Sequence, residues 1–236
     1  MDIVYTLRRD EQSHNTQLRY SLRSVVKHLK NYGNVYVVGA NPRLNGVIHI
    51  PYVDYVNSFR NAAHNIAEKV LAAAAHPGIS QRFIYMADDY FLLQDIDAEA
   101  YPYYTSGSLK ALAETQNSWY AGLIRDTAKA LSAHKKTTYN FNLHAPFVYD
   151  KDELPKVYNA FDWRKRGLLI KSLYGNMLGL YSGNEMKDCK IAHDRSIAFI
   201  EGRIEGRHVF STGNEWKFTQ IGEILDSLYP KKTIYE

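Results

Sequence analysis

Two adjacent carboxylates, Asp88 and Asp89, are the side chains of this sequence best suited to chemistry. They follow an apolar run, residues 82–87, whose β-forming composition is typical of a strand buried in the middle of a parallel sheet. Burying two ionised aspartates side by side is costly without a cation, so we expect the pair where the strand emerges, at its carboxyl end. Open α/β sheets bind their ligands there, and a divalent metal carrying a phosphorylated ligand would suit the pair. The alternative is a strand-to-turn junction with solvated aspartates.

Two arginines could serve the same phosphate. Arg19 and Arg23 are four residues apart in a stretch with helical apolar spacing, so they share one face of a predicted helix. Arg19 lies in the first turn, where a cation opposes the helix dipole. This placement makes sense if a phosphate binds both the arginine and the free backbone N–H groups, while the alternative is a solvated surface arginine. Arg8 and Arg9 end the first predicted strand, residues 2–7, and would lie nearby.

The remaining donor-binding candidates also stand at element ends. Asn41 follows a predicted strand over residues 34–39, and Arg60 and Asn61 begin a predicted helix that runs from about Ser58 to Ala75. With a short strand over residues 47–53, the first ninety residues follow the order β-α-β-β-α-β, so a mostly parallel sheet would gather these clusters at one edge. Neither G-x-G-x-x-G nor the P-loop motif occurs, which argues against Rossmann dehydrogenases and P-loop kinases.

His144 is the candidate acid or base of the second half. It precedes Ala145-Pro146 in a stretch expected to be extended, among asparagines and aromatic residues, and histidine titrates near neutral pH. A structural or surface histidine is the alternative. The second half is otherwise predicted to be helical at residues 109–113, 119–133, 152–161, 167–174 and 218–228. The tandem Ile-Glu-Gly-Arg copies at 200–207 are expected to form a loop.

The bulk composition fits one globular domain without a linker, in which residues 1–95 form a donor-binding core and residues 96–236 the acceptor side. The net charge of +4 is too small for a polybasic nucleic-acid binder, although basic clusters occur at 135–136, 164–166 and 231–232. Cys189 is the single cysteine, so no intrachain disulfide can form. Without an apolar segment of membrane-spanning length or a signal sequence, a cytoplasmic location is expected.

Four blocks of the sequence resemble the conserved blocks of the Stealth proteins, which are sugar-1-phosphate transferases of capsule assembly and lysosomal enzyme tagging. The match spans about residues 2–157 and rests on these blocks in order: Asp-Ile-Val-Tyr-Thr at 2–6, Leu-Arg-Tyr-Ser-Leu-Arg-Ser at 18–24, Arg-Phe-Ile-Tyr-Met-Ala-Asp-Asp-Tyr-Phe at 82–91 and His-Ala-Pro at 144–146. The resemblance implies a glycosyltransferase-like α/β core, in which Arg19 and Arg23 serve the donor phosphates. It assigns Asp88 and Asp89 to a metal or the acceptor, and His144 to acid/base chemistry or a phosphate contact.

The chain departs from the Stealth pattern in two places. The Trp-Val-Asp/Asn-Gly that follows the first strand in that family is missing, because Thr6 runs into Leu7, and Ala87 replaces the usual Asn before the two aspartates. The compact layout also resembles, more loosely, small phage-encoded glycosyltransferases, some of which act on modified DNA bases.

These observations predict a single-domain α/β protein of GT-A-like (Rossmann-like) type, with a mostly parallel sheet, flanking helices and a more helical C-terminal part. The predicted activity is transfer of a sugar from a UDP- or GDP-sugar to a hydroxyl acceptor, either a polysaccharide or hydroxymethylated DNA. Mg²⁺ or Mn²⁺, held by Asp88 and Asp89, is the predicted cofactor. Asp89 and His144 are the predicted catalytic residues, and a carboxylate or His144 would accept the proton of the acceptor hydroxyl. A Stealth-like sugar-phosphate transfer and a non-catalytic nucleotide- or polyanion-binding module are the alternatives.

Overall fold

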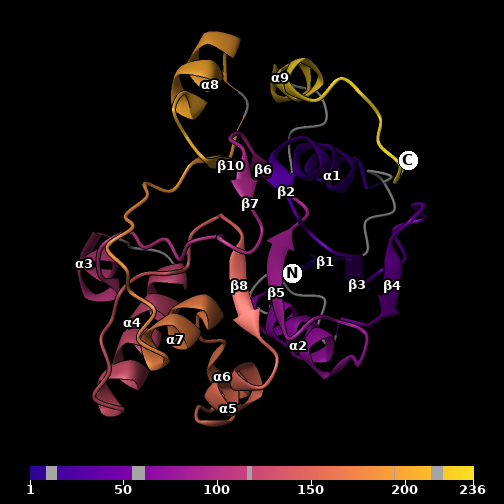
Figure 1. Ribbon diagram of the computed structural model, residues 1–236. Helices are drawn as coiled ribbons and strands as arrows, with labels where there is room; N and C mark the ends of the chain where they lie inside the picture. Colours follow the sequence, from indigo (N-terminus) through magenta and orange to yellow (C-terminus); the bar gives the residue numbers. More distant parts are fainter. Residues whose placement is uncertain (9–14, 55–61, 116–118, 194, 214–219) are drawn as a thin grey trace.

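The computed structural model describes residues 1–8, 15–54, 62–115, 119–193, 195–213 and 220–236. Its centre is a five-stranded sheet with the strand order β4-β3-β1-β5-β8 (Figure 1). The strands of this sheet are β1 (Asp2–Leu7), β3 (Val35–Gly39), β4 (Ile48–Pro51), β5 (Arg82–Ala87) and β8 (Phe147–Asp150). All neighbouring pairs are parallel except β5 and β8, so the sheet is mostly parallel, as predicted.

The two faces of the sheet are covered by different sets of residues. Because side chains alternate along a strand, Val4 of β1 packs into one core while Ile3 and Tyr5 pack into the other. The helices of the Val4 core are α2 (Ala62–Ala75), α4 (Trp119–Ala133), α5 (Glu153–Asn159), α6 (Trp163–Arg166) and α7 (Ile170–Met177). The Ile3 core contains α1 (Thr16–His28), whose Leu18, Leu22 and Val25 are buried there. This three-layer arrangement explains why the central strands read as continuous apolar runs.

A smaller three-stranded sheet lies beside the main one, in the order β6-β10-β9. It consists of β6 (Tyr90–Leu92), β9 (Lys190–Ile191) and β10 (Val209–Thr212). Phe91 and Phe210 pack under it with α8 (Ile197–Ile204) and α9 (Gln220–Leu228), which lie at the top of Figure 1. Because β6 starts directly after Asp89, this small sheet brings the last third of the chain to the aspartate pair.

The remaining elements are short. They are β2 (Leu29–Lys30), which pairs with β7 (Ile96–Asp97), and α3 (Leu109–Thr115), which packs on α4. The predicted helix that carries Arg19 and Arg23 ends at His28, directly before β2. No helix within the described ranges is long and apolar enough to span a membrane.

One sequence interpretation is wrong at the level of elements. The tandem Ile-Glu-Gly-Arg stretch was expected to form a loop, but its first copy lies in the helix Ile197–Ile204, which buries Ile200 and Ile204, and only residues 205–207 lie beyond the helix. Ser196 caps this helix by accepting a hydrogen bond from the backbone N–H of Phe199. The apolar residues at 197, 200 and 204 have helical spacing, which the repeat-like glycines and charges concealed.

Candidate active site

Asp88 and Asp89 stand at the carboxyl end of β5, between the main sheet and β6, and both side chains are partly exposed. Burial raises the pKa of Asp88 from 3.8 to about 7, and the neighbouring charge of Asp89 raises it further, against the opposing charges of Lys69 and Arg8. Burial also raises the pKa of Asp89, while Lys190 and His144 lower it. The pair therefore concentrates negative charge at one place, with the cations Lys69 and Arg8 acting on Asp88 and the cation Lys190 acting on Asp89.

Lys69 of α2 fixes one side of this edge. Its ammonium is buried and donates a hydrogen bond to the carbonyl of Leu7 at 2.9 Å, at the end of β1. It also forms an ion pair of 2.6 Å with Asp54. Gly39 ends β3 at a positive φ of 126°, and a Cβ there would lie 2.0 Å from the Leu7 carbonyl oxygen. Only glycine permits this close approach, which lets the ends of β1 and β3 meet beside Asp88.

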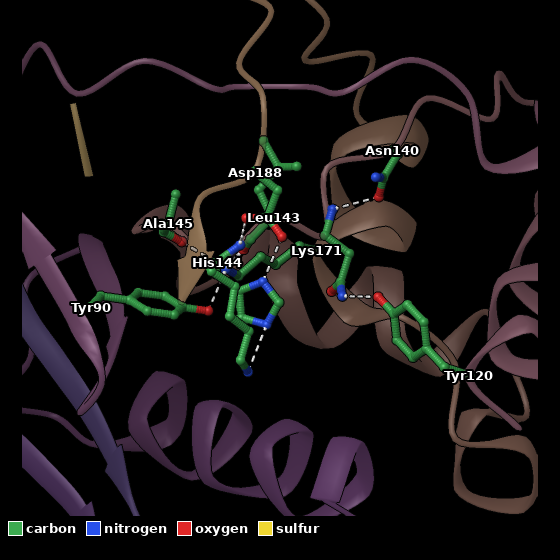
Figure 2. Close-up of polar contacts among 10 residues, drawn as sticks. Tyr90, Tyr120, Asn140, Leu143, His144, Ala145, Lys171 and Asp188 are labelled. Atoms are coloured by element: carbon green, nitrogen blue, oxygen red, sulfur yellow. Dashed lines mark hydrogen bonds and ion pairs between the residues drawn. The ribbon is translucent and has the colours of Figure 1, made fainter. Parts of the chain in front are cut away.

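His144 lies on the other side of the pair, in the segment that leads into β8. Leu143 and Ala145 are buried, so the backbone is anchored on both sides of a partly exposed imidazole. Asp188 accepts two hydrogen bonds from this residue, one from the backbone N–H at 2.9 Å and one from Nδ1 at 2.6 Å (Figure 2). Burial raises the pKa of Asp188, but the two hydrogen bonds from His144, together with the charges of His144 and Lys171, outweigh it, and the pKa lies below its usual range.

The Asp188 contact fixes the tautomer of the imidazole. Since Nδ1 faces a carboxylate it carries the proton, and Nε2 is left as an acceptor. Nε2 lies 3.2 Å from the ammonium of Lys190, the first residue of β9. Lys190 is also the strongest of the charges that lower the pKa of Asp89, so it connects the histidine to the aspartate pair electrostatically.

Lys171 of α7 binds the backbone around His144. Its buried ammonium donates hydrogen bonds to the carbonyls of Leu143 and Ala145, at 2.8 and 2.7 Å, and contacts the hydroxyl of Tyr90 at 3.2 Å. It therefore holds the peptide groups on both sides of His144 (Figure 2). Burial lowers the pKa of Lys171 from 10.5 to about 7, and the charges of Asp188 and Asp89 oppose this shift.

The predicted donor-binding arginines have structural partners. Nε and Nη2 of Arg23 donate to the two carboxylate oxygens of Glu236, both at 2.7 Å, and Nη1 donates to the carbonyl of Tyr229 at 3.1 Å. Nη1 of Arg19 lies 3.9 Å from the same Glu236 carboxylate, and its side chain is about one third exposed. The guanidinium of Arg23 thus holds the C-terminal segment against α1, and its role toward a donor stays a prediction.

The other predicted donor residues are distributed differently. Asn41 is exposed just beyond the end of β3, where its side-chain oxygen accepts a hydrogen bond of 2.9 Å from the backbone N–H of Arg43. Arg9, Arg60 and Asn61 lie outside the residues that the structure describes.

The two serines of the Leu-Arg-Tyr-Ser-Leu-Arg-Ser block connect α1 to β6. Ser21 is buried and donates to the carbonyl of Tyr90 at 2.6 Å, and the Ser24 hydroxyl accepts from the N–H of Leu92 at 3.0 Å. This block of α1 therefore positions β6, the strand that directly follows the two aspartates.

The carboxylate oxygens of Asp88 and Asp89 could supply part of the coordination shell of a hard divalent cation. Two adjacent carboxylates, one with its pKa raised to about 7, would be relieved by a bound Mg²⁺ or Mn²⁺. No group of three or more His, Cys, Asp or Glu side chains within the described ranges could surround a metal. Asp88 and Asp89 could therefore supply only part of a coordination sphere, and phosphate oxygens and water would have to complete it.

Four residues of this site were missed by the sequence interpretation: Lys69, Lys171, Asp188 and Lys190. For Lys171 a signal existed, because it is the single charge inside the apolar run of residues 167–174, and a buried lysine needs partners. Asp188 and Lys190 carry no local signal, since only the pairing of β9 with β10 brings them to His144.

Structural comparison supports the fold. No protein-family model and no curated protein sequence matches this chain. Two crystal structures of LgtC resemble it, one of an active-site mutant and one of the galactosyltransferase with donor and acceptor sugar analogs. Each has a TM-score of 0.54 and 11% sequence identity over 99% of this chain and 96% of the other. Mouse xyloside xylosyltransferase 1 has a TM-score of 0.46 at 11% identity, over 91% and 98% of the two chains. The chain is thus a single-domain α/β protein with a GT-A-like fold, as predicted from the sequence.

Proposed function

We propose that the protein is a glycosyltransferase that moves a sugar from a nucleoside-diphosphate sugar to a hydroxyl acceptor. The observation that carries this proposal is the convergence of Asp88, Asp89, Lys190 and the Asp188–His144 pair at the carboxyl edge of the sheet. This is the edge at which open α/β sheets bind nucleotides. The likeness to LgtC, a galactosyltransferase crystallised with donor and acceptor sugar analogs, supports the same reading.

In the proposed reaction the acceptor oxygen attacks the anomeric carbon, and the bond from that carbon to the diphosphate oxygen breaks. The acceptor proton passes to Nε2 of His144, and Asp188 stabilises the resulting imidazolium through Nδ1–H. Because Nε2 now faces the ammonium of Lys190, the lysine must first turn away, and the incoming diphosphate is an anion that would attract it. A divalent cation held by Asp88 and Asp89 would supply positive charge to the departing diphosphate.

The aspartate pair provides the experiment that separates this proposal from a binding module without turnover. We expect Asp89→Ala to abolish consumption of UDP- or GDP-sugars in the presence of Mg²⁺ or Mn²⁺. Calorimetry would follow nucleotide binding in the same samples, and Asn159→Ala, an exposed change in α5, serves as the control. Full turnover by Asp89→Ala would contradict the proposal, and nucleotide binding without turnover by the unmodified protein would favour the module.

A Stealth-like sugar-1-phosphate transfer is the second candidate. It is favoured by the blocks at 18–24, 82–91 and 144–146 and by the histidine that lies beside the aspartate pair. The acceptor oxygen would then attack the phosphorus next to the sugar, and a nucleoside monophosphate would leave. We prefer glycosyl transfer because the motif that follows the first strand in that family is missing here.

A further inference from the structure

Two residues before His144 in the chain, an asparagine forms with a tyrosine a polar pair that the proposed reaction does not use. The side-chain N–H of Asn142 donates to the hydroxyl of Tyr120 at 2.9 Å (Figure 2). Tyr120 belongs to the first turn of α4, and Asn142 precedes the histidine by two residues. We propose that Tyr120 and Asn142, with the adjacent indole of Trp119, form the subsite that binds a neutral saccharide as the acceptor. This inference rests on the proposed glycosyltransferase function.

Tyr120 and Asn142 each have polar atoms that could form further hydrogen bonds. Because the hydroxyl of Tyr120 accepts from Asn142, its own proton remains available to a ligand. The side-chain oxygen of Asn142 and its second amide proton form no hydrogen bond within the described part of the chain. A donor and an acceptor side by side match a sugar hydroxyl, which accepts and donates at one atom.

The pair is also fixed in position. Asn140 is buried, and its side-chain oxygen accepts a hydrogen bond of 3.0 Å from the backbone N–H of Asn142. Phe141, Leu143 and Ala145 are all buried, so Asn142 and His144 are the partly exposed residues between them. A ligand held by Asn142 would thus lie beside the imidazole, in a geometry that needs little reorganisation.

An aromatic surface adjoins the pair. Trp119 is 45% exposed, and its ring meets that of Tyr120 edge to face with centroids 6.1 Å apart. An exposed indole next to directed polar groups is the combination that binds ligands with one apolar and one polar side, such as a pyranose ring.

The charges near the pair favour a saccharide over DNA. Burial and the charge of Asp188 raise the pKa of Tyr120, and the hydrogen bond from Asn142 opposes this shift, so the charge that acts on the hydroxyl is negative. The cluster Lys135-Lys136 follows the opposite end of α4, about 20 Å from Trp119 by the helical rise. A phosphate backbone would need several cations, and none of the three side chains of the proposed subsite is cationic.

The test compares donor hydrolysis with acceptor transfer. Asn142→Ala and Tyr120→Phe are assayed with UDP- and GDP-sugars in water alone, then with neutral mono- and oligosaccharides, then with hydroxymethylated duplex DNA. Asn159→Ala is the matched control, and saccharide binding is measured separately by calorimetry. We expect both variants to hydrolyse the donor at the unmodified rate, while the KM for the saccharide rises about tenfold for each hydrogen bond lost.

The other outcomes separate the two proposals. Unchanged saccharide KM in both variants, or transfer to DNA and to no saccharide, would overturn the subsite while leaving the glycosyltransferase intact. Equal loss of hydrolysis and transfer in correctly folded variants would also overturn it, because the pair would then serve the donor. If the unmodified protein consumes no nucleotide sugar, the proposed function fails, and saccharide binding that Asn142→Ala weakens would still support the subsite. Absence of saccharide binding in that case would overturn both.

Discussion

The imidazole of His144 depends on Asp188 for its protonation pattern. The carboxylate keeps the proton on Nδ1 and leaves Nε2 as the acceptor. In Asp188→Asn the new amide can donate to Nδ1 and so favour the opposite tautomer, which cannot accept the acceptor proton. We predict that kcat falls by a factor of about 10² to 10⁴ while nucleotide affinity is kept. Steady-state kinetics with calorimetry checks this, and an unchanged kcat would exclude His144 as the base.

Asp88 makes stability depend on pH between about 4 and 7. Its pKa is 3.8 in the unfolded chain and about 7 in the folded protein, so the folded protein keeps a proton that the unfolded chain has released. The contribution of this group to the free energy of unfolding is therefore present at low pH and is lost as the pH rises to about 7. We predict that Asp88→Asn is more stable than the unmodified protein by about 1–2 kcal/mol at pH 8 without divalent cations.

Urea unfolding at pH 5 and pH 8 with a chelator measures this difference. Mn²⁺ should raise the melting temperature of the unmodified protein and have little effect on Asp88→Asn, because bound cations stabilise only the fold that holds them. A variant that is less stable at pH 8, or that responds equally to Mn²⁺, would contradict the assigned cation site.

The titration of Lys171 changes the free energy of unfolding in the opposite direction, and it does so at higher pH. Its pKa is 10.5 in the unfolded chain and about 7 in the folded protein, so between these values the unfolded chain binds a proton that the folded protein lacks. The free energy of unfolding therefore rises with pH across this interval. A neutral amine would still satisfy its surroundings, because it keeps two N–H groups for the carbonyls of Leu143 and Ala145 and gains a lone pair that could accept from the hydroxyl of Tyr90. We predict that this rise, about 2–4 kcal/mol, is absent in Lys171→Met. Equal slopes in both proteins, from unfolding curves at pH 7 to 10, would contradict it.

At the scale of elements, Arg23 joins α1 to the C-terminal segment. The carboxylate of Glu236 is 3% exposed and receives both of its hydrogen bonds from one guanidinium, an arrangement stronger than a surface ion pair. We predict that Arg23→Lys and Glu236→Gln each lower the free energy of unfolding by about 2–4 kcal/mol. Because the two residues form one contact, the double variant should cost little more than either single one.

A second readout decides between this structural role and the donor-binding role that the sequence predicted. If Arg23 contacts the donor, Arg23→Lys should weaken nucleotide binding, and Glu236→Gln should not do so. If the contact is structural, the two variants should have the same nucleotide affinity as the unmodified protein at temperatures where they are folded.

Local sequence patterns were sufficient for the buried parallel strands of the first half and for most helices of the second half, and insufficient for the short strands. The apolar runs at 2–7, 34–39 and 82–87 predicted buried parallel strands, and the structure confirms them. The strand at 90–92 and the strands β9 and β10 are two to four residues long and pair over large sequence separations, so no local periodicity marks them. Lys190 and Asp188 depend on that pairing, so no local pattern could indicate their part in the site.

At the scale of the whole molecule, the small sheet completes the site. The large sheet presents Asp88 and Asp89, but Lys190 and Thr212 reach this edge only through β9 and β10, which pack on α8 and α9 (Figure 1). The amide side chain of Gln17, at the start of α1, donates to the hydroxyl of Thr212 at 2.8 Å and so ties α1 to the small sheet. The candidate active site is therefore assembled from both ends of the chain.

The measurement that tests the central claim most directly is the identity of the released nucleotide. The protein is incubated with Mg²⁺ or Mn²⁺, UDP- and GDP-sugars and saccharide acceptors, and nucleoside monophosphate is resolved from nucleoside diphosphate. We predict release of the diphosphate, faster with an acceptor than in water alone and lost in Asp89→Ala. Release of the monophosphate would contradict glycosyl transfer and establish the sugar-phosphate chemistry of the Stealth proteins in its place.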